Sequence, residues 1–134
     1  MTADPFTRYP GAAKGEYGDS EALCEELVSL IVAGLKTATC GALRDYEAEG
    51  APLPEVGQYE VVLHWDGTPA AVTRTTQVTV QPYSSVTEDF ALAEGENDDF
   101  AGWDAGHRAY FDRNGGWSPD MKLVCQRFEL VEVL

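Results

Sequence analysis

The sequence predicts an α+β fold, in which a small mixed or antiparallel β-barrel carries helices at its ends. Three observations lead to this prediction. The chain has 134 residues, of which 44% are apolar, enough for one domain with an ordinary core. Helical spacing and strand-like alternation of apolar residues occupy separate stretches. These stretches follow one another as helix, strand, hairpin, helices and strand, without internal repeats or an interdomain linker.

The N-terminal stretch, residues 1–18, has no sustained period and is rich in prolines and glycines. We expect it to form an irregular arm, because such composition is typical of segments without regular structure. Aromatic residues are expected to pack it onto the domain: Phe6, Tyr9 and Tyr17. The single domain is then expected to cover residues 19–134.

The first helix is predicted to begin at Asp19 or Ser20, since both residue types are good N-caps. Apolar residues then recur at helical spacing and define one buried face: Leu23, Leu27, Leu30 and Ile31. Gly34 is the expected stop signal, because glycine accepts the left-handed conformation that often ends a helix.

A short strand is predicted at residues 37–43, followed by a polar helical turn at residues 45–50. Residues 58–65 and 70–80 alternate with many β-branched side chains and flank the turn signal of residues 66–69. We therefore expect an antiparallel hairpin. The alternation is imperfect from Arg74 to Gln77, which indicates a bulge or bend.

The C-terminal part of the sequence predicts two helices and a strand. A short helix is expected at residues 86–93, begun by Thr87 or a nearby serine, and a second helix at residues 100–113. An acidic turn, residues 94–99, separates them. Residues 121–134 alternate and predict a long final strand.

The formal net charge of −14 is the strongest compositional signal. Overall acidity repels polyanions at long range, so we expect a small or short single-stranded ligand and not a nucleic acid duplex. No stretch has the length and apolar character of a membrane span or a secretory signal. The three cysteines lack metal-ligand spacing and suggest reduced thiols in a cytoplasmic protein without a metal site.

The stretch Gly34-Leu35-Lys36-Thr37-Ala38-Thr39 crowds a lysine and two hydroxyls after an apolar run. If apolar residues desolvate Lys36, its neutral amine becomes accessible and can accept a proton from a threonine. Lys36 and Thr39 share a face only if the chain turns there, whereas an extended chain puts Thr37 and Thr39 together. The alternative interpretation is a solvated lysine that caps the end of the helix.

Two further stretches carry candidate functional side chains. Glu94 or Glu96 of the acidic turn can supply a carboxylate near Lys36, or the turn is simply solvated. Helical spacing aligns four aromatic residues: Trp103, His107, Tyr110 and Phe111. Such a stripe is able to stack a nucleobase, but helical aromatic stripes are more often part of a core.

The chain resembles ASCH-domain proteins of the PUA-like superfamily from about Tyr17 to its end. This resemblance implies a small β-barrel with flanking helices, in agreement with the pattern described above. The segments that carry it are Tyr17-Gly18-Asp19-Ser20, residues 34–40, 53–57, 86–91 and 94–96, Trp103 with residues 107–111, and residues 121–128.

The resemblance implies RNA binding, with hydrolysis in some members. One hydrolase group removes the acetyl group of N4-acetylcytidine, and RNA cleavage without added metal is attributed to other relatives. By position the resemblance assigns Lys36 as proton acceptor, Thr39 as nucleophile and Glu94 as proton donor. Gly34, Thr37 and Glu96 are the expected substrate-binding residues, with Glu96 as the alternative donor.

Many members of the family instead carry Gly-x-Lys-x-x-Glu-x-Arg. In this chain Thr39 stands at the glutamate position and Gly41 at the arginine position. That departure disfavours a role in RNA binding. It favours hydrolysis of an N4-acetylated cytidine-type nucleoside without a cofactor. An RNA-binding module and a metal-independent ribonuclease are the alternatives. A small nucleoside or a short single-stranded RNA is the expected partner.

Overall fold

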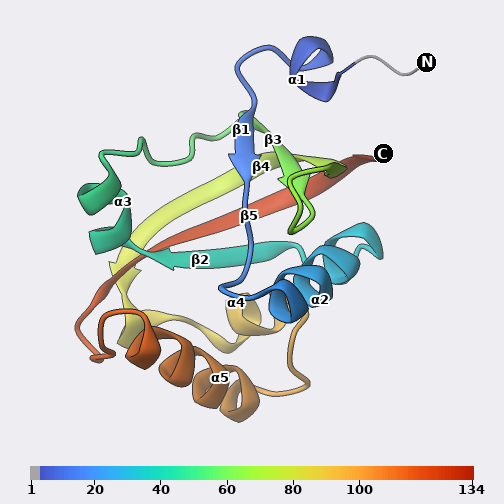
Figure 1. Ribbon diagram of the computed structural model, residues 1–134. Helices are drawn as coiled ribbons and strands as arrows, with labels where there is room; N and C mark the ends of the chain where they lie inside the picture. Colours follow the sequence, from blue (N-terminus) through green and yellow to red (C-terminus); the bar gives the residue numbers. More distant parts are fainter. Residues whose placement is uncertain (1–3) are drawn as a thin grey trace.

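The computed structural model describes residues 4–134 and shows an α+β architecture (Figure 1). The helices are α1 (Pro5–Arg8), α2 (Glu21–Val32), α3 (Leu43–Glu49), α4 (Glu88–Ala93), α5 (Phe100–Arg113) and the 3-10 turn η1 (Tyr83–Ser85). The strands are β1 (Ala13–Gly15), β2 (Ala38–Ala42), β3 (Tyr59–Leu63), β4 (Pro69–Pro82) and β5 (Lys122–Val133).

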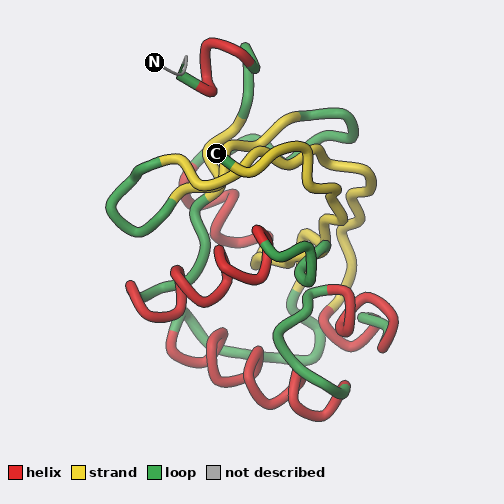
Figure 2. The backbone as a smooth tube through the Cα atoms, turned by 90° about the vertical axis from the view of Figure 1, so that its right-hand side faces the viewer, coloured by secondary structure: helices red, strands yellow, loops and turns green. Residues whose placement is uncertain are grey.

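The five strands form one mixed sheet in the order β1-β3-β4-β5-β2. β1 runs parallel to β3, and the other neighbours are antiparallel. The sheet curls into a half-barrel, with most helices gathered on its open side, whereas α1 lies apart from them beside the N-terminus (Figure 2). This arrangement confirms the predicted α+β fold with a small mixed barrel and flanking helices.

The long strands β4 and β5 curve because their pairing is interrupted. The register shifts between Thr75 and Gln77, and again between Val72 and Thr73. An extra residue in one strand bends it and increases its local twist. The first shift lies in the stretch where broken alternation predicts a bulge, so that prediction is confirmed.

Helix α2 begins where the sequence predicts. Ser20 is the N-cap, and its hydroxyl accepts a hydrogen bond from the amide of Leu23. Leu27, Val28 and Ile31 are buried against the β3–β4 part of the sheet. Helix α5 likewise matches its predicted bounds and is capped by Asp99, whose carboxylate accepts from the amide of Gly102.

The prediction of an irregular arm over residues 1–18 is wrong where the structure describes regular elements. Residues 5–8 form α1, and residues 13–15 form β1 at the edge of the sheet. Three residues are too few to establish a period, so the sequence contains little signal for a strand whose partner, β3, follows more than 40 positions later. Residues 1–3 of the predicted arm lie outside the described residues.

Two larger apolar clusters hold the helices against opposite ends of the sheet. One joins α2 to β3, β4 and β5. The other packs α4, α5 and η1 against β2 and β5, with Trp103 completely buried in it. The segment from Gly34 to Thr39 connects α2, which belongs to the first cluster, to β2, whose Ala38 belongs to the second.

Candidate functional site

The segment that contains Lys36 forms a turn between α2 and β2. Gly34 follows α2 in the left-handed region, with φ of 77°. The amides of Leu35 and Lys36 both donate to the carbonyl of Leu30, at 2.9 and 3.1 Å. These bonds turn the chain back over the end of the helix before β2 begins at Ala38. This is the turn that the sequence analysis requires if Lys36 and Thr39 are to lie on the same face.

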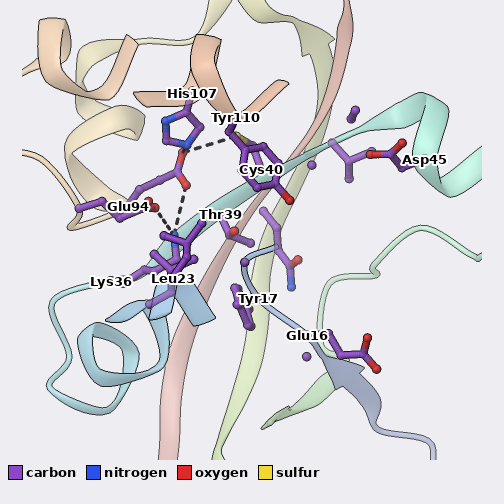
Figure 3. A pocket seen from close by; sticks show the side chains of 18 of the residues that line it. Glu16, Tyr17, Leu23, Lys36, Thr39, Cys40, Asp45, Glu94, His107 and Tyr110 are labelled. Carbon is purple, nitrogen blue, oxygen red and sulfur yellow. Dashed lines mark hydrogen bonds and ion pairs between the residues drawn. The ribbon is translucent and has the colours of Figure 1, made fainter. Parts of the chain in front are cut away.

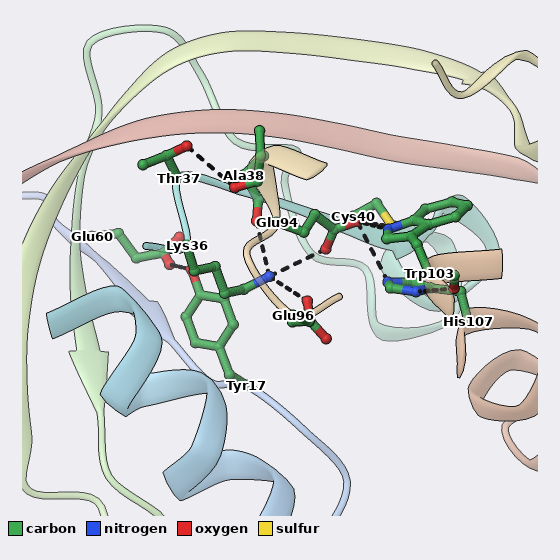
Figure 4. A network of polar contacts seen from close by, with 11 residues as sticks. Tyr17, Lys36, Thr37, Ala38, Cys40, Glu60, Glu94, Glu96, Trp103 and His107 are labelled. Carbon is green, nitrogen blue, oxygen red and sulfur yellow. Dashed lines mark hydrogen bonds and ion pairs between the residues drawn. The ribbon is translucent and has the colours of Figure 1, made fainter. Parts of the chain in front are cut away.

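Lys36 is buried, with 2% of its surface exposed. Its ammonium donates to three acceptors: the carbonyl of Ala38 at 2.9 Å, Glu94 Oε1 at 3.2 Å and Glu96 Oε2 at 2.7 Å (Figure 4). The interpretation of Lys36 as a solvated helix cap is therefore wrong. The burial of Lys36 agrees with the other interpretation, in which the side chain is removed from bulk water.

The charge state of Lys36 differs from the one we expected. Burial alone lowers the pKa of the lysine, but the charges and hydrogen bonds of Glu94 and Glu96 outweigh burial and raise it above its ordinary value. The expectation of a partly neutral amine is thus wrong for the resting site. Sequence spacing did not reveal that two carboxylates would both reach the same ammonium.

Glu94 is the most enclosed carboxylate of the site and ends α4. Burial raises its pKa, but Lys36, His107 and the indole of Trp103 favour the charged form and lower the pKa overall. Trp103 Nε1 donates to Oε2 at 2.7 Å, and His107 Nε2 lies 3.4 Å from the same oxygen. Glu94 is therefore held as a carboxylate in a fixed orientation.

The acidic turn reaches Lys36 because two chain segments pack backbone against backbone. The amide of Thr37 donates to the carbonyl of Ala93 at 2.8 Å. Gly95 has φ of 72°, and a Cβ at this position would lie 2.2 Å from the carbonyl oxygen of Leu35. Only glycine permits this approach. The turn of residues 94–99 is thus folded over the lysine and is not simply solvated.

A cavity of about 410 Å³ opens beside this cluster (Figure 3). Lys36, Thr39, Glu94 and Glu96 all line it. The predicted catalytic residues are therefore brought together, with Thr39 on β2 and the glutamates on the turn after α4. The volume is within the range of about 300–1,000 Å³ that is typical of small-molecule sites.

Two predicted substrate-binding residues lie elsewhere. Gly34 is exposed and does not line the cavity, and a Cβ added to it would have no neighbouring atom within 4 Å. Thr37 also lies outside the cavity. Its hydroxyl donates to the carbonyl of Ala93 at 3.2 Å. Both residues shape the turn, so the prediction that they contact substrate is wrong for this cavity.

A further carboxyl group of the cavity, that of Glu60, was not identified from the sequence. Tyr17 donates its hydroxyl to Glu60 Oε1 at 2.7 Å. Burial raises the pKa of Glu60, and the opposing partners Tyr17 and Gln126 are both neutral. Gly15 makes room for the carboxyl group, since a Cβ there would lie 2.5 Å from Oε1. The alternation of β3 places Glu60 on one face of the strand, but it does not reveal that this face lines a cavity.

The lining of the cavity is predominantly acidic. Two of its three basic residues are already paired, Lys36 with the two glutamates and Arg113 with Asp19 at 2.7 Å. Lys14 is the third. The acidic lining residues are Glu16, Glu26, Asp45, Glu60, Glu94 and Glu96. This charge disfavours a polyanion and suits a neutral ligand or a cationic one.

The aromatic stripe of α5 divides between the core and the site. Trp103 and Phe111 are buried in the apolar cluster, as the core interpretation expects. His107 and Tyr110 are partly buried and line the cavity, which Phe111 also borders. The ring of His107 stacks on Trp103 with centroids 4.3 Å apart, and its Nδ1 lies 2.8 Å from the Trp103 carbonyl.

One group of side chains in the described chain has the composition of a metal site: Cys40, Glu94 and His107. Their nearest ligand atoms all lie within 4.8 Å of one another. Burial raises the pKa of the Cys40 thiol well above its usual value, and the neighbouring Glu94 adds to this effect. Cys40 is therefore a thiol and not a nucleophilic thiolate in the site as it stands.

The model of the ASCH domain family matches residues 14–132. An ASCH domain structure from Lactobacillus crispatus JV V101 is 31% identical with a TM-score of 0.82, over 97% of this chain and 86% of the other. A protein structure from Enterococcus faecalis V583 is 38% identical with a TM-score of 0.81, over 90% and 77% of the two chains.

A more distant structure, an ASCH protein variant from Zymomonas mobilis, shares the fold with a TM-score of 0.58 and 11% identity, over 94% of this chain and 75% of the other. The search of curated proteins found no match. In residues 4–134 no helix is both long enough and apolar enough to cross a membrane.

Proposed function

Because the chain belongs to the ASCH domain family, we propose that it hydrolyses the amide bond of a small N4-acetylated cytidine-type nucleoside. The observation that carries this proposal is the convergence of Lys36, Thr39 and Glu94 on one cavity of nucleoside size. These residues come from a turn, a strand and the end of a helix. A hydroxyl, an amine and a carboxylate are the groups that acyl transfer from an amide requires.

In the proposed reaction the Thr39 hydroxyl oxygen attacks the acetyl carbonyl, and the C–N bond to the exocyclic nitrogen then breaks. The proton of Thr39 passes to Lys36. Since Lys36 is already an ammonium, it must first pass one of its own protons to Glu94 or Glu96. The protonated glutamate then gives that proton to the departing amine. Water hydrolyses the acetyl-threonine ester and releases acetate.

This sequence of proton transfers uses the observed contacts of Lys36. The ammonium already donates to both glutamates, at 3.2 and 2.7 Å, so a proton has a short path between them. Glu96 is the more accessible of the two, with 20% of its side chain exposed against 2% for Glu94. Burial and pairing hold Lys36 and Glu94 in place and thus limit reorganisation during the reaction.

The remainder of the cavity suits a neutral nucleoside. Glu60 is partly buried, lines the cavity and has only neutral hydrogen-bond partners. Its carboxyl group is therefore suited to accept hydrogen bonds from hydroxyl or amino groups of a ligand. The acidic lining opposes a phosphate-rich chain, so we favour a free nucleoside over RNA.

The proposal is tested by incubating the protein with N4-acetylcytidine and, separately, with single-stranded RNA. We expect acetate and cytidine from the first substrate and no cleavage of the second. The measurement is chromatography of the nucleosides together with an assay for acetate. RNA fragments without acetate release would instead support a ribonuclease, and salt-sensitive RNA binding without any turnover would support a binding module.

A further inference from the structure

Three side chains with donor atoms of different chemistry lie next to one another in the polar network (Figure 4). Cys40 lies on β2, Glu94 ends α4, and His107 lies on α5. The Cys40 sulfur is 3.5 Å from Glu94 Oε2, and His107 Nε2 is 3.4 Å from the same oxygen. Around a tetrahedral Zn²⁺ with bonds of usual length, neighbouring ligand atoms lie about 3.4–3.6 Å apart. The two separations agree with that geometry.

The hydrogen bonds around these donors are those that metal ligands ordinarily make. His107 Nδ1 lies 2.8 Å from the carbonyl of Trp103. Since a carbonyl only accepts, Nδ1 carries the hydrogen and Nε2 faces Glu94. Glu94 is oriented in turn, because Trp103 Nε1 donates to Oε2 and Lys36 donates to Oε1. Such outer contacts fix the ring and the carboxylate in position.

We propose that Cys40, Glu94 and His107 bind a thiophilic divalent cation, Zn²⁺ in particular, with the remaining coordination position facing the cavity. Thiolate, imidazole and carboxylate together suit Zn²⁺ or Co²⁺, whereas Mg²⁺ and Ca²⁺ prefer oxygen ligands alone. All three residues line the cavity, so an ion can enter from it. When the metal binds, the thiol proton of Cys40 and any proton on His107 Nε2 are released to the buffer.

This inference does not depend on the proposed hydrolysis, and it replaces the sequence-based expectation that the chain has no metal site. That expectation rested on spacing along the chain. Cys40 and His107 are far apart in sequence, and α5 brings them together through its packing on β2. Because Glu94 serves both the metal and Lys36, a bound Zn²⁺ is expected to inhibit the proposed proton transfer.

The test is a titration of the chelator-treated protein with Co²⁺ under reducing conditions, followed by absorption spectroscopy. We expect one equivalent of Co²⁺ to give the visible bands of a tetrahedral site and a near-ultraviolet sulfur-to-cobalt charge-transfer band. Zn²⁺ should displace the Co²⁺ and abolish both. Cys40→Ser should lose the charge-transfer band, and His107→Gln should weaken Zn²⁺ binding at least about tenfold.

The chain offers matched controls for both variants. Cys125 is the cross-strand partner of Cys40 but is not one of the three donors, and His64 is bound to Glu25 away from the cavity. Cys125→Ser and His64→Gln should therefore keep the wild-type spectrum. Circular dichroism shows whether each variant is folded. Absence of the bands in the folded wild type, or their persistence in both Cys40→Ser and His107→Gln, would overturn the inference.

Discussion

Lys36 Nζ lies 3.2 Å from Glu94 Oε1, and the two side chains are 1% and 2% exposed. Removing only one partner of a buried ion pair strongly destabilises a protein, because the other charge then lacks its partner. The pair therefore serves the fold as well as the proposed chemistry. Substitutions at either residue must be interpreted with both roles in mind.

Lys36→Met should destabilise the protein by about 3–5 kcal/mol, because it removes the ammonium that pairs with the buried carboxylate of Glu94. Lys36→Met combined with Glu94→Gln should recover part of that loss, since the second change removes the isolated charge. The free energies of unfolding in urea measure both effects. A Lys36→Met variant as stable as the wild type would show that the pair contributes little.

Glu60→Gln should be neutral or stabilising at pH 7, by about 1 kcal/mol or less, because glutamine cannot ionise in a site that disfavours the charged carboxylate. The raised pKa of Glu60 gives the sign of its pH dependence. Below pH 4.5, the ordinary pKa of a glutamate, the carboxyl group is protonated in both the folded and the unfolded protein, so it does not reduce the stability of the wild type. As the pH rises through the folded-state pKa, the wild type loses stability. Urea titrations at pH 4 and pH 7 should thus show the gain at pH 7 alone.

The same Glu60→Gln variant should bind cytidine, the product of the proposed reaction, at least about tenfold more weakly. A hydrogen bond to a charged group contributes about 1.5–3 kcal/mol, and the amide retains only part of it. Isothermal titration calorimetry measures the affinity. Equal affinity in the two proteins would exclude Glu60 from ligand recognition.

Gly95→Ala should be far more damaging than Gly34→Ala, although both glycines have positive φ, at 72° and 77°. At Gly34 nothing lies within 4 Å, so the cost is the backbone conformation alone, about 1–2 kcal/mol. At Gly95 the added Cβ meets the backbone of Leu35 and separates the two turns of the site. We expect a loss of about 3 kcal/mol or more. Thermal unfolding of the two variants provides the comparison, and equal losses would contradict the close approach.

The pair of Asp19 and Arg113 should contribute stability only above acidic pH. Arg113 and Asn114 lower the pKa of Asp19 from 3.8 to about 2. A lowered pKa means that the contribution is complete above pH 3.8 and disappears as pH falls toward 2. Because the pair is partly exposed to solvent, we expect about 0.5–1 kcal/mol between the wild type and Asp19→Asn at pH 6. Urea unfolding at pH 6, 4 and 3 should show this difference shrinking, and a constant difference would contradict it.

Sequence patterns predicted the elements best where a local cause acts. The Ser20 cap and the leucine spacing located α2, and the aromatic run with its final glycines located α5. β1 was missed because a three-residue strand has too little periodicity. Its position at the sheet edge depends on β3, which is distant along the chain.

The same distinction applies to the candidate site. The motif indicated that Lys36 and Thr39 act together, and both line the cavity. The predicted charge state of Lys36, a partly neutral amine, was wrong. The observed one depends on two carboxylates that come from a turn about 60 positions away. Glu60 was missed because the alternation of β3 contains no signal for the cavity that this strand borders. The aromatic stripe identified His107, but its spacing did not reveal the contact with Glu94.

The two threonines of the motif provide the most direct measurement of the proposed chemistry. Thr39 lines the cavity with Lys36, whereas Thr37 donates its hydroxyl to the carbonyl of Ala93 outside it. Valine keeps the shape of threonine and removes the hydroxyl, so the two variants form a matched pair.

The measurement is the rate of acetate release from N4-acetylcytidine by the wild type, Thr39→Val and Thr37→Val. We predict that Thr39→Val loses at least about a thousandfold in rate and that Thr37→Val stays within about tenfold of the wild type. A Thr39→Val protein that releases acetate as fast as the wild type would contradict the proposed role of this hydroxyl.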